Sequence, residues 1–289
     1  MRSLLFVPAD SAKKLAKGFD SGADALILDL EDSVSAERKA GARDTALAYL
    51  KEHAPRTPRP RLVVRVNALD TGLTDADLDA IVAGKPDAIL LPKAEGGPSV
   101  IHLDAKLTAR EALHGLAEGA IEIIALATET ASALFLCGSY RDASPRLTGL
   151  TWGAEDLSAE LGAETNRDAD GHFTSPYMLA RNLSLAAAAS ARVQPIDTVY
   201  ADFRNMAGLR QEAEEARRDG FTAKMAIHPA QVAVINAVFT PSPAEIEKAR
   251  AVVNAFAADP AAGVVGIGGV MYDRPHLRRA EQLLARTKT

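Results

Sequence analysis

Short apolar runs alternate with longer amphipathic stretches through most of the chain, and this alternation is the feature that most constrains the fold. Most of the runs are continuous rather than alternating, which is typical of strands covered by helices on both faces, as in parallel sheets. The amphipathic stretches are expected to be helices, and Gly220 is an expected helix stop. The apolar runs lie at residues 4–7, 25–28, 62–66, 88–91, 121–127, 147–152, 198–201 and 221–227.

Eight strands that alternate with helices in one domain predict a (β/α)8 barrel, or TIM barrel, over residues 1–235. A doubly wound open sheet is the alternative, but no glycine-rich phosphate turn follows the first apolar run. The chain has 289 residues, of which 47% are hydrophobic, so it can bury a large core. The sequence therefore favours an α/β barrel that carries the active site.

Residues 236–289 are predicted to form C-terminal helices and a glycine-rich arm that follow the barrel. Ser242 and Glu245 have the spacing of a capping box, which indicates a helix to about residue 257. Residues 263–273 contain a Gly-x-Gly-Gly, but no strand–helix unit surrounds it, so a flexible arm or hairpin is favoured over a nucleotide site. A final helix is expected over residues 275–286.

Composition and the start of the chain narrow the class of protein. A formal net charge of -5 argues against a nucleic-acid partner, which calls for a basic patch. The single cysteine, Cys137, allows no intramolecular disulfide and suits a reducing compartment as a structural thiol. Pro8 and Asp10 come too soon for a signal peptide, and no run approaches the roughly 20 apolar residues of a membrane span. We expect a soluble, cytoplasmic protein with no membrane partner.

Charged residues follow nearly every apolar run, at the carboxyl ends of the expected strands, where the active site of such a barrel lies. Burying so many charges is unfavourable unless they pair with each other or with a metal. A catalytic or binding mouth is therefore predicted at this end. Its candidate residues are Asp29, Glu31, Asp32, Arg65, Asn67, Lys93, Glu129, Glu155, Asp156, Asp202, His228 and Pro229.

Glu129 and Asp156 follow the fifth and sixth apolar runs. Neighbouring strands lie about 5 Å apart, so both carboxylates are close enough to bind one hard divalent cation. The alternative is that each acid caps the helix after its strand. Recurrence of charged residues around the barrel favours the metal site.

Arg65 lies within an apolar strand, where a buried guanidinium requires a planar anion. A substrate carboxylate or enolate would serve, and so would a salt bridge to Asp29 or Glu31, which does not exclude substrate contact. His228 is a candidate base, although with Pro229 it is more readily explained as shaping the last loop.

Six segments together resemble the citrate lyase beta-subunit-like family of the aldolase and citrate lyase barrel superfamily, which includes malyl-CoA and citramalyl-CoA lyases. The resemblance runs in order from Arg2 to Asp273. One departure is mild: residues 127–131 read Ala-Thr-Glu-Thr-Ala where the family often has isoleucine or valine before the glutamate, and Glu129 is retained. The segments are residues 2–8, 28–34, 64–67, 91–93, 152–157 and 227–231.

The resemblance implies a (β/α)8 barrel, a homotrimer or hexamer, and Mg²⁺ held by Glu129 and Asp156. It implies that Arg65 contacts the small acid. Residues 271–273 resemble the methionine-x-aspartate of stand-alone CoA lyases, in which the aspartate reaches a neighbouring subunit's site, so Asp273 is the candidate acid–base group. A structural or disordered tail is the alternative for this segment.

The expected function is a Mg²⁺-dependent carbon–carbon lyase or synthase that interconverts a 3-hydroxyacyl-CoA with acetyl-CoA and a 2-oxo acid. Three alternatives stay open: a CoA-independent pyruvate-type class II aldolase, a citrate lyase beta subunit that works only in a complex, and a silent binding protein, which the retained acid pair disfavours. The expected catalytic residues are Arg65, Asp273, Asp29, Glu31 and Asp32. Substrate or CoA contacts are expected from Arg65, Glu129, Glu155, Asp156, His228, Pro229, Arg2, Lys14 and Lys93.

Overall fold

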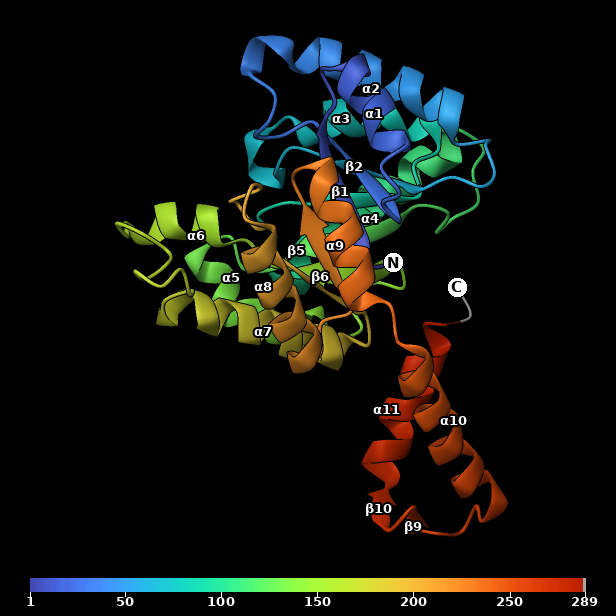
Figure 1. The fold of residues 1–289 in the computed structure, drawn as a ribbon. Coiled ribbons are helices and arrows are strands. Elements are labelled where there is room, and N and C mark those ends of the chain that lie inside the picture. The colour runs from blue at the N-terminus through green and yellow to red at the C-terminus, as the bar shows by residue number, and fades with distance from the viewer. Residues whose placement is uncertain (288–289) are drawn as a thin grey trace. The chain divides into compact units, whose positions relative to one another are not determined.

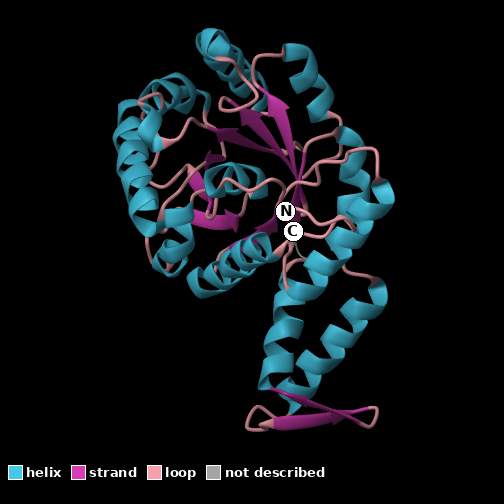
Figure 2. Cartoon of the chain, turned by 90° about the vertical axis from the view of Figure 1, so that its left-hand side faces the viewer, coloured by secondary structure: helices cyan, strands magenta, loops and turns pink. Residues whose placement is uncertain are grey.

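The computed structural model describes residues 1–287, and the chain divides into two compact units, Met1–Phe239 and a second that begins at Thr240. In the first unit, eight parallel strands close into a barrel, and helices surround it (Figures 1 and 2). This confirms the predicted (β/α)8 barrel. The strands are β1 (Ser3–Pro8), β2 (Ala25–Asp29), β3 (Arg61–Arg65), β4 (Ala88–Leu91), β5 (Glu122–Leu126), β6 (Leu147–Thr151), β7 (Gln194–Asp197) and β8 (Ala223–Ala226).

The helices of the first unit lie between successive strands, with α9 after the last. Four short 3-10 turns accompany them: η1 (Ala36–Arg38), η2 (Leu69–Thr71), η3 (Val82–Gly84) and η4 (Cys137–Tyr140). The helices are α1 (Ala12–Phe19), α2 (Lys39–His53), α3 (Thr74–Ile81), α4 (Gly96–Leu113), α5 (Ala131–Leu136), α6 (Ala154–Leu161), α7 (Ser175–Ala191), α8 (Met206–Asp219) and α9 (Pro229–Phe239).

The continuous apolar runs are explained by burial on both faces of the strands. One set of side chains, among them Ile27, Val63 and Ile124, packs inside the barrel. The other set, among them Leu28 and Val64, packs against the surrounding helices. Leu4 of β1 is in register with Ala25 of β2 and with Met225 of β8, so β1 pairs with both strands and closes the barrel. The strand ends therefore form a rigid ring on which functional side chains are mounted.

The prediction for the seventh strand is wrong. Residues 198–201 form no strand, and β7 is instead Gln194–Asp197, immediately before them. The sequence of β7 does not predict a strand, because it begins with a glutamine and a proline. Proline lacks the N–H that normally donates to a neighbouring strand, so Pro195 argues against a central strand. It is tolerated here because the Pro195 carbonyl still accepts a hydrogen bond from the Thr222 N–H at 3.0 Å. As a result, Asp197 ends the seventh strand, and Asp202 lies in an exposed loop.

The second unit contains α10 (Pro243–Ala258), β9 (Val264–Ile267), β10 (Val270–Asp273) and α11 (Arg274–Ala285). The capping box of Ser242 and Glu245 is present, as predicted. The glycine-rich segment forms an antiparallel hairpin whose turn uses Gly268 and Gly269 at φ 58° and 80°, angles that favour glycine. Phe256, Tyr272 and neighbouring apolar side chains give the unit a small core of its own.

Cys137 is buried in η4, and its thiol donates a hydrogen bond to the Ala133 carbonyl at 3.4 Å. Burial raises the pKa of the thiol to about 11, so it is a poor nucleophile, as expected for a structural cysteine. Among residues 1–287, no helix is long and apolar enough to cross a membrane.

Candidate active site

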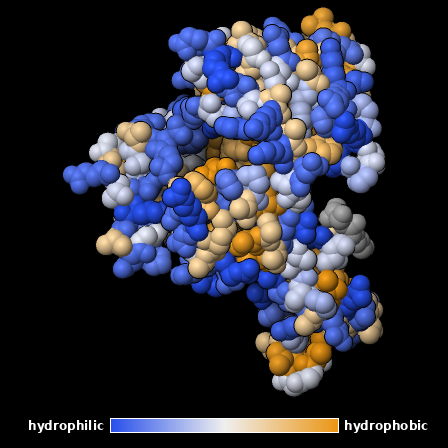
Figure 3. Space-filling model, turned by 45° about the horizontal axis from the view of Figure 1, so that its top comes forward, coloured by the Kyte–Doolittle hydropathy of each residue, from blue (hydrophilic) through white to orange (hydrophobic). Residues whose placement is uncertain are grey.

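A cavity of about 440 Å³ opens at the carboxyl ends of the barrel strands. Figure 3 shows apolar surface gathered in a hollow near the middle of the visible face, with polar residues around it. Apolar side chains such as Leu126 and Met225 line part of the cavity. The charged side chains in the lining are Asp29, Asp32, Arg65, Glu129, Glu155, Asp156 and Arg167.

The predicted acid pair is brought together in this cavity. The side chain of Glu129 is buried, and its Oε2 accepts a hydrogen bond from the Lys93 backbone N–H at 2.6 Å. Gly153 leaves room for it, since a Cβ there would lie 2.9 Å from the Glu129 Cγ. Burial and, after it, the nearby Asp156 carboxylate raise the pKa of Glu129 to about 8. Asp156 lies in the first turn of α6, where the helix dipole favours an anion.

The chemistry of this pair fits a hard divalent cation. Two oxygen donors are close enough to repel each other, and a cation between them would remove that repulsion. In the described chain, no cluster of three or more His, Cys, Asp or Glu side chains is arranged to hold a metal. The protein would therefore supply two carboxylates and leave the remaining positions to water and substrate, as is usual for Mg²⁺.

Arg65 ends β3, and carboxylates hold its guanidinium at all three nitrogens. Its Nε and Nη2 each donate to the Asp29 carboxylate at 2.7 Å, and its Nη1 pairs with Glu31 at 2.8 Å. Asp32 lies 3.5 Å from the same Nη1. Burial opposes the charge, yet these carboxylates raise the pKa of Arg65 above its ordinary value. The salt-bridge alternative is thus confirmed, and the guanidinium is fixed at the edge of the cavity.

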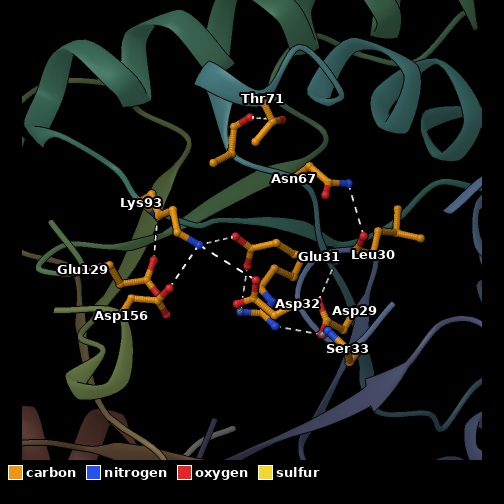
Figure 4. A network of polar contacts seen from close by, with 12 residues as sticks. Asp29, Leu30, Glu31, Asp32, Ser33, Asn67, Thr71, Lys93, Glu129 and Asp156 are labelled. Carbon is orange, nitrogen blue, oxygen red and sulfur yellow. Dashed lines mark hydrogen bonds and ion pairs between the residues drawn. The ribbon is translucent and has the colours of Figure 1, made fainter. Parts of the chain in front are cut away.

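Lys93 connects the arginine cluster to the acid pair. Its ammonium lies 2.7 Å from Glu31 and 3.2 Å from Asp156 (Figure 4). The backbone of Lys93 has φ 48°, in the left-handed region, and its N–H donates to Glu129. A non-glycine residue in this conformation costs free energy, which the contacts to all three acids offset. Lys93 is therefore part of the site, with its charge committed to carboxylates.

Of the other predicted contact residues, Glu155 lines the cavity, whereas His228, Pro229 and Lys14 are exposed. Glu155 lines the cavity, and its carboxylate accepts from the Asn166 amide at 2.9 Å. His228 and Pro229 are exposed at the start of α9, where the imidazole stacks on Phe203 at 5.0 Å. This position agrees with a role in shaping the last loop. Lys14 is exposed on α1, which follows the carboxyl end of β1, and stays a predicted CoA contact.

Arg2 is not brought to the site. It precedes β1, at the amino end of the barrel, and its guanidinium pairs with Asp24 at 2.7 Å just before β2. The cavity opens at the opposite ends of the same strands, so the structure contradicts Arg2 as a contact for a thioester bound there. Its place in a recognisable motif reflects barrel closure, since its carbonyl also accepts from the Lys224 N–H at 2.9 Å.

The lining also includes residues that were not predicted from the sequence, among them Trp152, Arg167 and Phe173. The last two belong to the connection between α6 and α7, residues 162–174. Connections of that length are uncommon in compact domains and are usually functional, which was the available signal. Lys224 was also overlooked, although, like Arg65, it is a cation within an apolar run.

Comparison with known proteins gives one family and several relatives. The model of the HpcH/HpaI aldolase/citrate lyase family matches residues 2–229. The chain is 37% identical to the citrate lyase subunit beta of Escherichia coli K12, over 99% of this chain and 93% of that subunit. It is also 37% identical to a (3S)-malyl-CoA thioesterase of Cereibacter sphaeroides, over 99% and 94% of the two chains. A crystal structure of CitE from Mycobacterium tuberculosis with magnesium, acetoacetate and coenzyme A has a TM-score of 0.79 at 34% identity, covering 100% and 98% of the two chains.

Proposed function

This chain belongs to the HpcH/HpaI aldolase/citrate lyase family, and we propose that it is a Mg²⁺-dependent carbon–carbon lyase acting on CoA thioesters. It interconverts a 3-hydroxyacyl-CoA, of the malyl-CoA or citramalyl-CoA type, with acetyl-CoA and a 2-oxo acid. The observation that carries this proposal is one cavity lined by both the Glu129–Asp156 pair and the fixed guanidinium of Arg65. A metal-binding acid pair beside an anion-binding cation matches a 2-oxo acid, which presents a carboxylate next to a carbonyl.

Glu129 and Asp156 would hold the Mg²⁺, which, when bound, supplies Lewis-acid polarisation of the 2-oxo acid. Lys93 sets the position of the pair, since its backbone N–H fixes Glu129 and its ammonium contacts Asp156. These residues need no change of protonation during the reaction. Their role is to present two oxygen donors in a fixed geometry.

Arg65 binds the substrate carboxylate or the developing enolate oxygen in this proposal. A guanidinium has five N–H donors. Nε and Nη2 each give one N–H to Asp29, and Nη1 donates to Asp32 at 3.5 Å and pairs with Glu31 at 2.8 Å. The second N–H of Nη2 is the donor that we assign to the substrate anion. Asp29 and Glu31 thus orient the cation without neutralising its hydrogen-bonding capacity, which is how a preorganised anion site works.

Asp273 is the proposed acid–base group. In the condensation direction its carboxylate removes a proton from the methyl group of acetyl-CoA, and the resulting carbanion forms the bond to the oxo-acid carbonyl carbon. The carbonyl oxygen becomes an alkoxide and takes up a proton to give the 3-hydroxyl group. In cleavage the 3-hydroxyl loses its proton, the C–C bond breaks, and the Asp273 carboxyl gives a proton to the departing thioester carbanion. The carboxylate caps α11 by accepting from the His276 N–H and also contacts the His276 ring. The hydrogen bond to His276 holds the pKa of Asp273 below its ordinary value.

We also propose a homotrimer or hexamer in the cytoplasm, in which residues from 240 onward serve a neighbouring subunit's site. The resemblance of residues 271–273 to the methionine-x-aspartate of CoA lyases supports this arrangement. The single, buried thiol of Cys137 suits a reducing compartment.

The function is tested by a screen of the purified protein. Acetyl-CoA and propionyl-CoA are combined with glyoxylate, pyruvate and oxaloacetate, with and without Mg²⁺, and thioester products are separated by mass. We expect one pairing to give a 3-hydroxyacyl-CoA only when Mg²⁺ is present. Turnover of pyruvate with an aldehyde and no thioester would instead indicate the CoA-independent aldolase. Inactivity towards every free thioester would favour a subunit that needs a larger complex.

Asp273→Asn is expected to bind Mg²⁺ and the oxo acid normally but to lose thioester chemistry. Asparagine keeps an oxygen that caps α11, so the fold is retained while the base is lost. Mixing inactive Asp273→Asn chains with inactive Glu129→Ala chains is expected to restore partial activity, because some mixed sites contain both intact groups. Activity is measured after subunit exchange has been shown by mass spectrometry of the mixed oligomers.

The control for this prediction is His276→Gln, which disturbs the same helix start and keeps the carboxylate. It should retain most of the activity. Absence of recovery after proven exchange would place Asp273 in the site of its own chain or outside the mechanism.

A further inference from the structure

A buried ion cluster lies behind one wall of the cavity, which is formed by Trp152, Arg167 and Phe173. Lys224 of β8 is fully buried, with an exposed fraction of 0%, and its ammonium donates to Asp197 at 2.7 Å and to Glu212 at 2.9 Å. Burial lowers the pKa of this lysine, but the two carboxylates more than offset it and the pKa is raised. Neither Lys224 nor Asp197 lines the cavity. Buried charges of this kind add little stability by themselves, so another role is indicated.

The cluster contacts the wall at two points. The Trp152 indole N–H donates to Asp197 at 2.8 Å, and the Arg167 guanidinium pairs with Glu212 at 2.8 Å. Arg167 also lies over the Phe173 ring at 3.7 Å, and Phe173 meets Trp152 edge-on at 4.9 Å. These contacts close into a ring of six residues: Trp152, Asp197, Lys224, Glu212, Arg167 and Phe173.

Part of this wall borders two cavities. Arg167 and Phe173 line the cavity of about 440 Å³ and also a second cavity of about 880 Å³. Their segment is held by an isolated bridge between these two residues and by a turn at Asp168. Phe173 packs against the barrel core, whereas Arg167 borders both cavities. The ring of polar and aromatic contacts therefore holds Arg167 and ties it to the packed aromatic pair.

We propose that Asp197 and Lys224 are positioning residues that fix the Trp152–Phe173–Arg167 wall and so set the fit of the substrate. The effect extends to the acid pair, because Trp152 is followed by Gly153, which packs directly on Glu129. The consequence for substrate rests on the proposed function, whereas the consequence for the wall does not. The two are therefore tested with separate readouts.

Trp152 is the only tryptophan in the chain, so its fluorescence reports on the wall alone. In Asp197→Asn and in Glu212→Gln we expect acrylamide quenching of Trp152 to increase, because the indole loses its ion-pair support or its Phe173 cover. We expect KM for the CoA thioester or the oxo acid to rise about tenfold, the effect of one lost buried hydrogen bond, with a smaller change in kcat. Glu212 is partly exposed, so Glu212→Gln also serves where Asp197→Asn fails to fold.

Glu111→Gln is the matched control, since Glu111 and Arg146 form an equally buried ion pair at 2.7 Å near the amino ends of the strands. It should lower the melting temperature and leave both Trp152 quenching and KM at the parent values. If the ring variants behave like this control, the positioning role is refuted. If quenching rises but no thioester is turned over even by the parent, the proposed function fails and the positioning of the wall stands.

Discussion

Replacing Glu129 with glutamine is expected to remove most of the Mg²⁺-dependent turnover and to raise the melting temperature of the metal-free protein at pH 7. The pKa of Glu129 is about 8 in the folded chain against an ordinary value of 4.5, with burial as the main cause. A carboxyl whose pKa is raised on folding costs no stability below the lower value, and its cost grows as pH rises to the upper one. Glutamine removes that cost and can still accept from the Lys93 N–H.

The same substitution removes a charged oxygen donor from the pair. We expect kcat to fall by about 10²–10³-fold or more, the scale of losing one preorganised electrostatic group. Mg²⁺ should raise the melting temperature of the parent through binding to the folded state and should leave that of Glu129→Gln unchanged. Scanning calorimetry with and without Mg²⁺, together with titration calorimetry, measures both effects.

Glu155→Gln provides the comparison, because Glu155 lines the same cavity, from the helix that carries Asp156, but contacts Asn166 rather than the pair. It should keep the Mg²⁺-dependent rise in melting temperature. Parent-like Mg²⁺ affinity in Glu129→Gln would remove Glu129 from the metal site.

Most of the fold could be predicted because the strands of the barrel appear in the sequence as continuous apolar runs. Burial on both faces leaves no alternation, and seven of the eight strands coincide with such runs. The seventh could not be found in this way, because β7 is Gln194–Asp197, with a glutamine at its start and Pro195 next. Its register with β6 and β8 is set by tertiary pairing, which no local pattern encodes.

The site was predictable to the extent that strand ends converge. Asp29, Arg65, Glu129 and Asp156 were found by that rule, and the structure places all of them around one cavity. The rule fails for residues on long connections, so Arg167 and Phe173 were missed. It also fails where a motif residue lies at the opposite strand end, as Arg2 does. The contact of Lys93 with Asp156 depends on the left-handed backbone conformation of Lys93, which cannot be predicted from the local sequence.

The two halves of the site are joined by charge rather than by packing. Arg65 is paired with Asp29 and Glu31, Glu31 is paired with Lys93, and Lys93 contacts Asp156. Each cation therefore lies between carboxylates, and the chain of ion pairs leads from the anion-binding side to the metal side. A substitution at Arg65 should act on the oxo acid first, because Lys93 holds the acid pair independently.

Arg65→Lys is expected to lower kcat/KM for the oxo acid by about 10²–10³-fold and to leave Mg²⁺ affinity close to that of the parent. Lysine keeps the positive charge, so Asp29 and Glu31 are not left as unpaired buried anions, and the fold should survive. Its ammonium is a point donor, however, and cannot hold the Asp29 carboxylate in two places while also presenting donors to a planar anion. Initial rates over a matrix of oxo-acid and thioester concentrations measure the effect, which should fall on the oxo acid.

Arg59→Lys is the matched control for this prediction. Arg59 makes the same two-pronged contact with a carboxylate, that of Asp87, at 2.5 and 2.9 Å, just before β3 and so at the amino end of the same strand. Its replacement should cost some stability and leave the kinetics unchanged, because the contact is remote from the cavity. Kinetics of Arg65→Lys that match those of Arg59→Lys would show that Arg65 is a structural ion pair. A selective loss towards the oxo acid would instead follow from a guanidinium that binds the substrate's carboxylate or enolate.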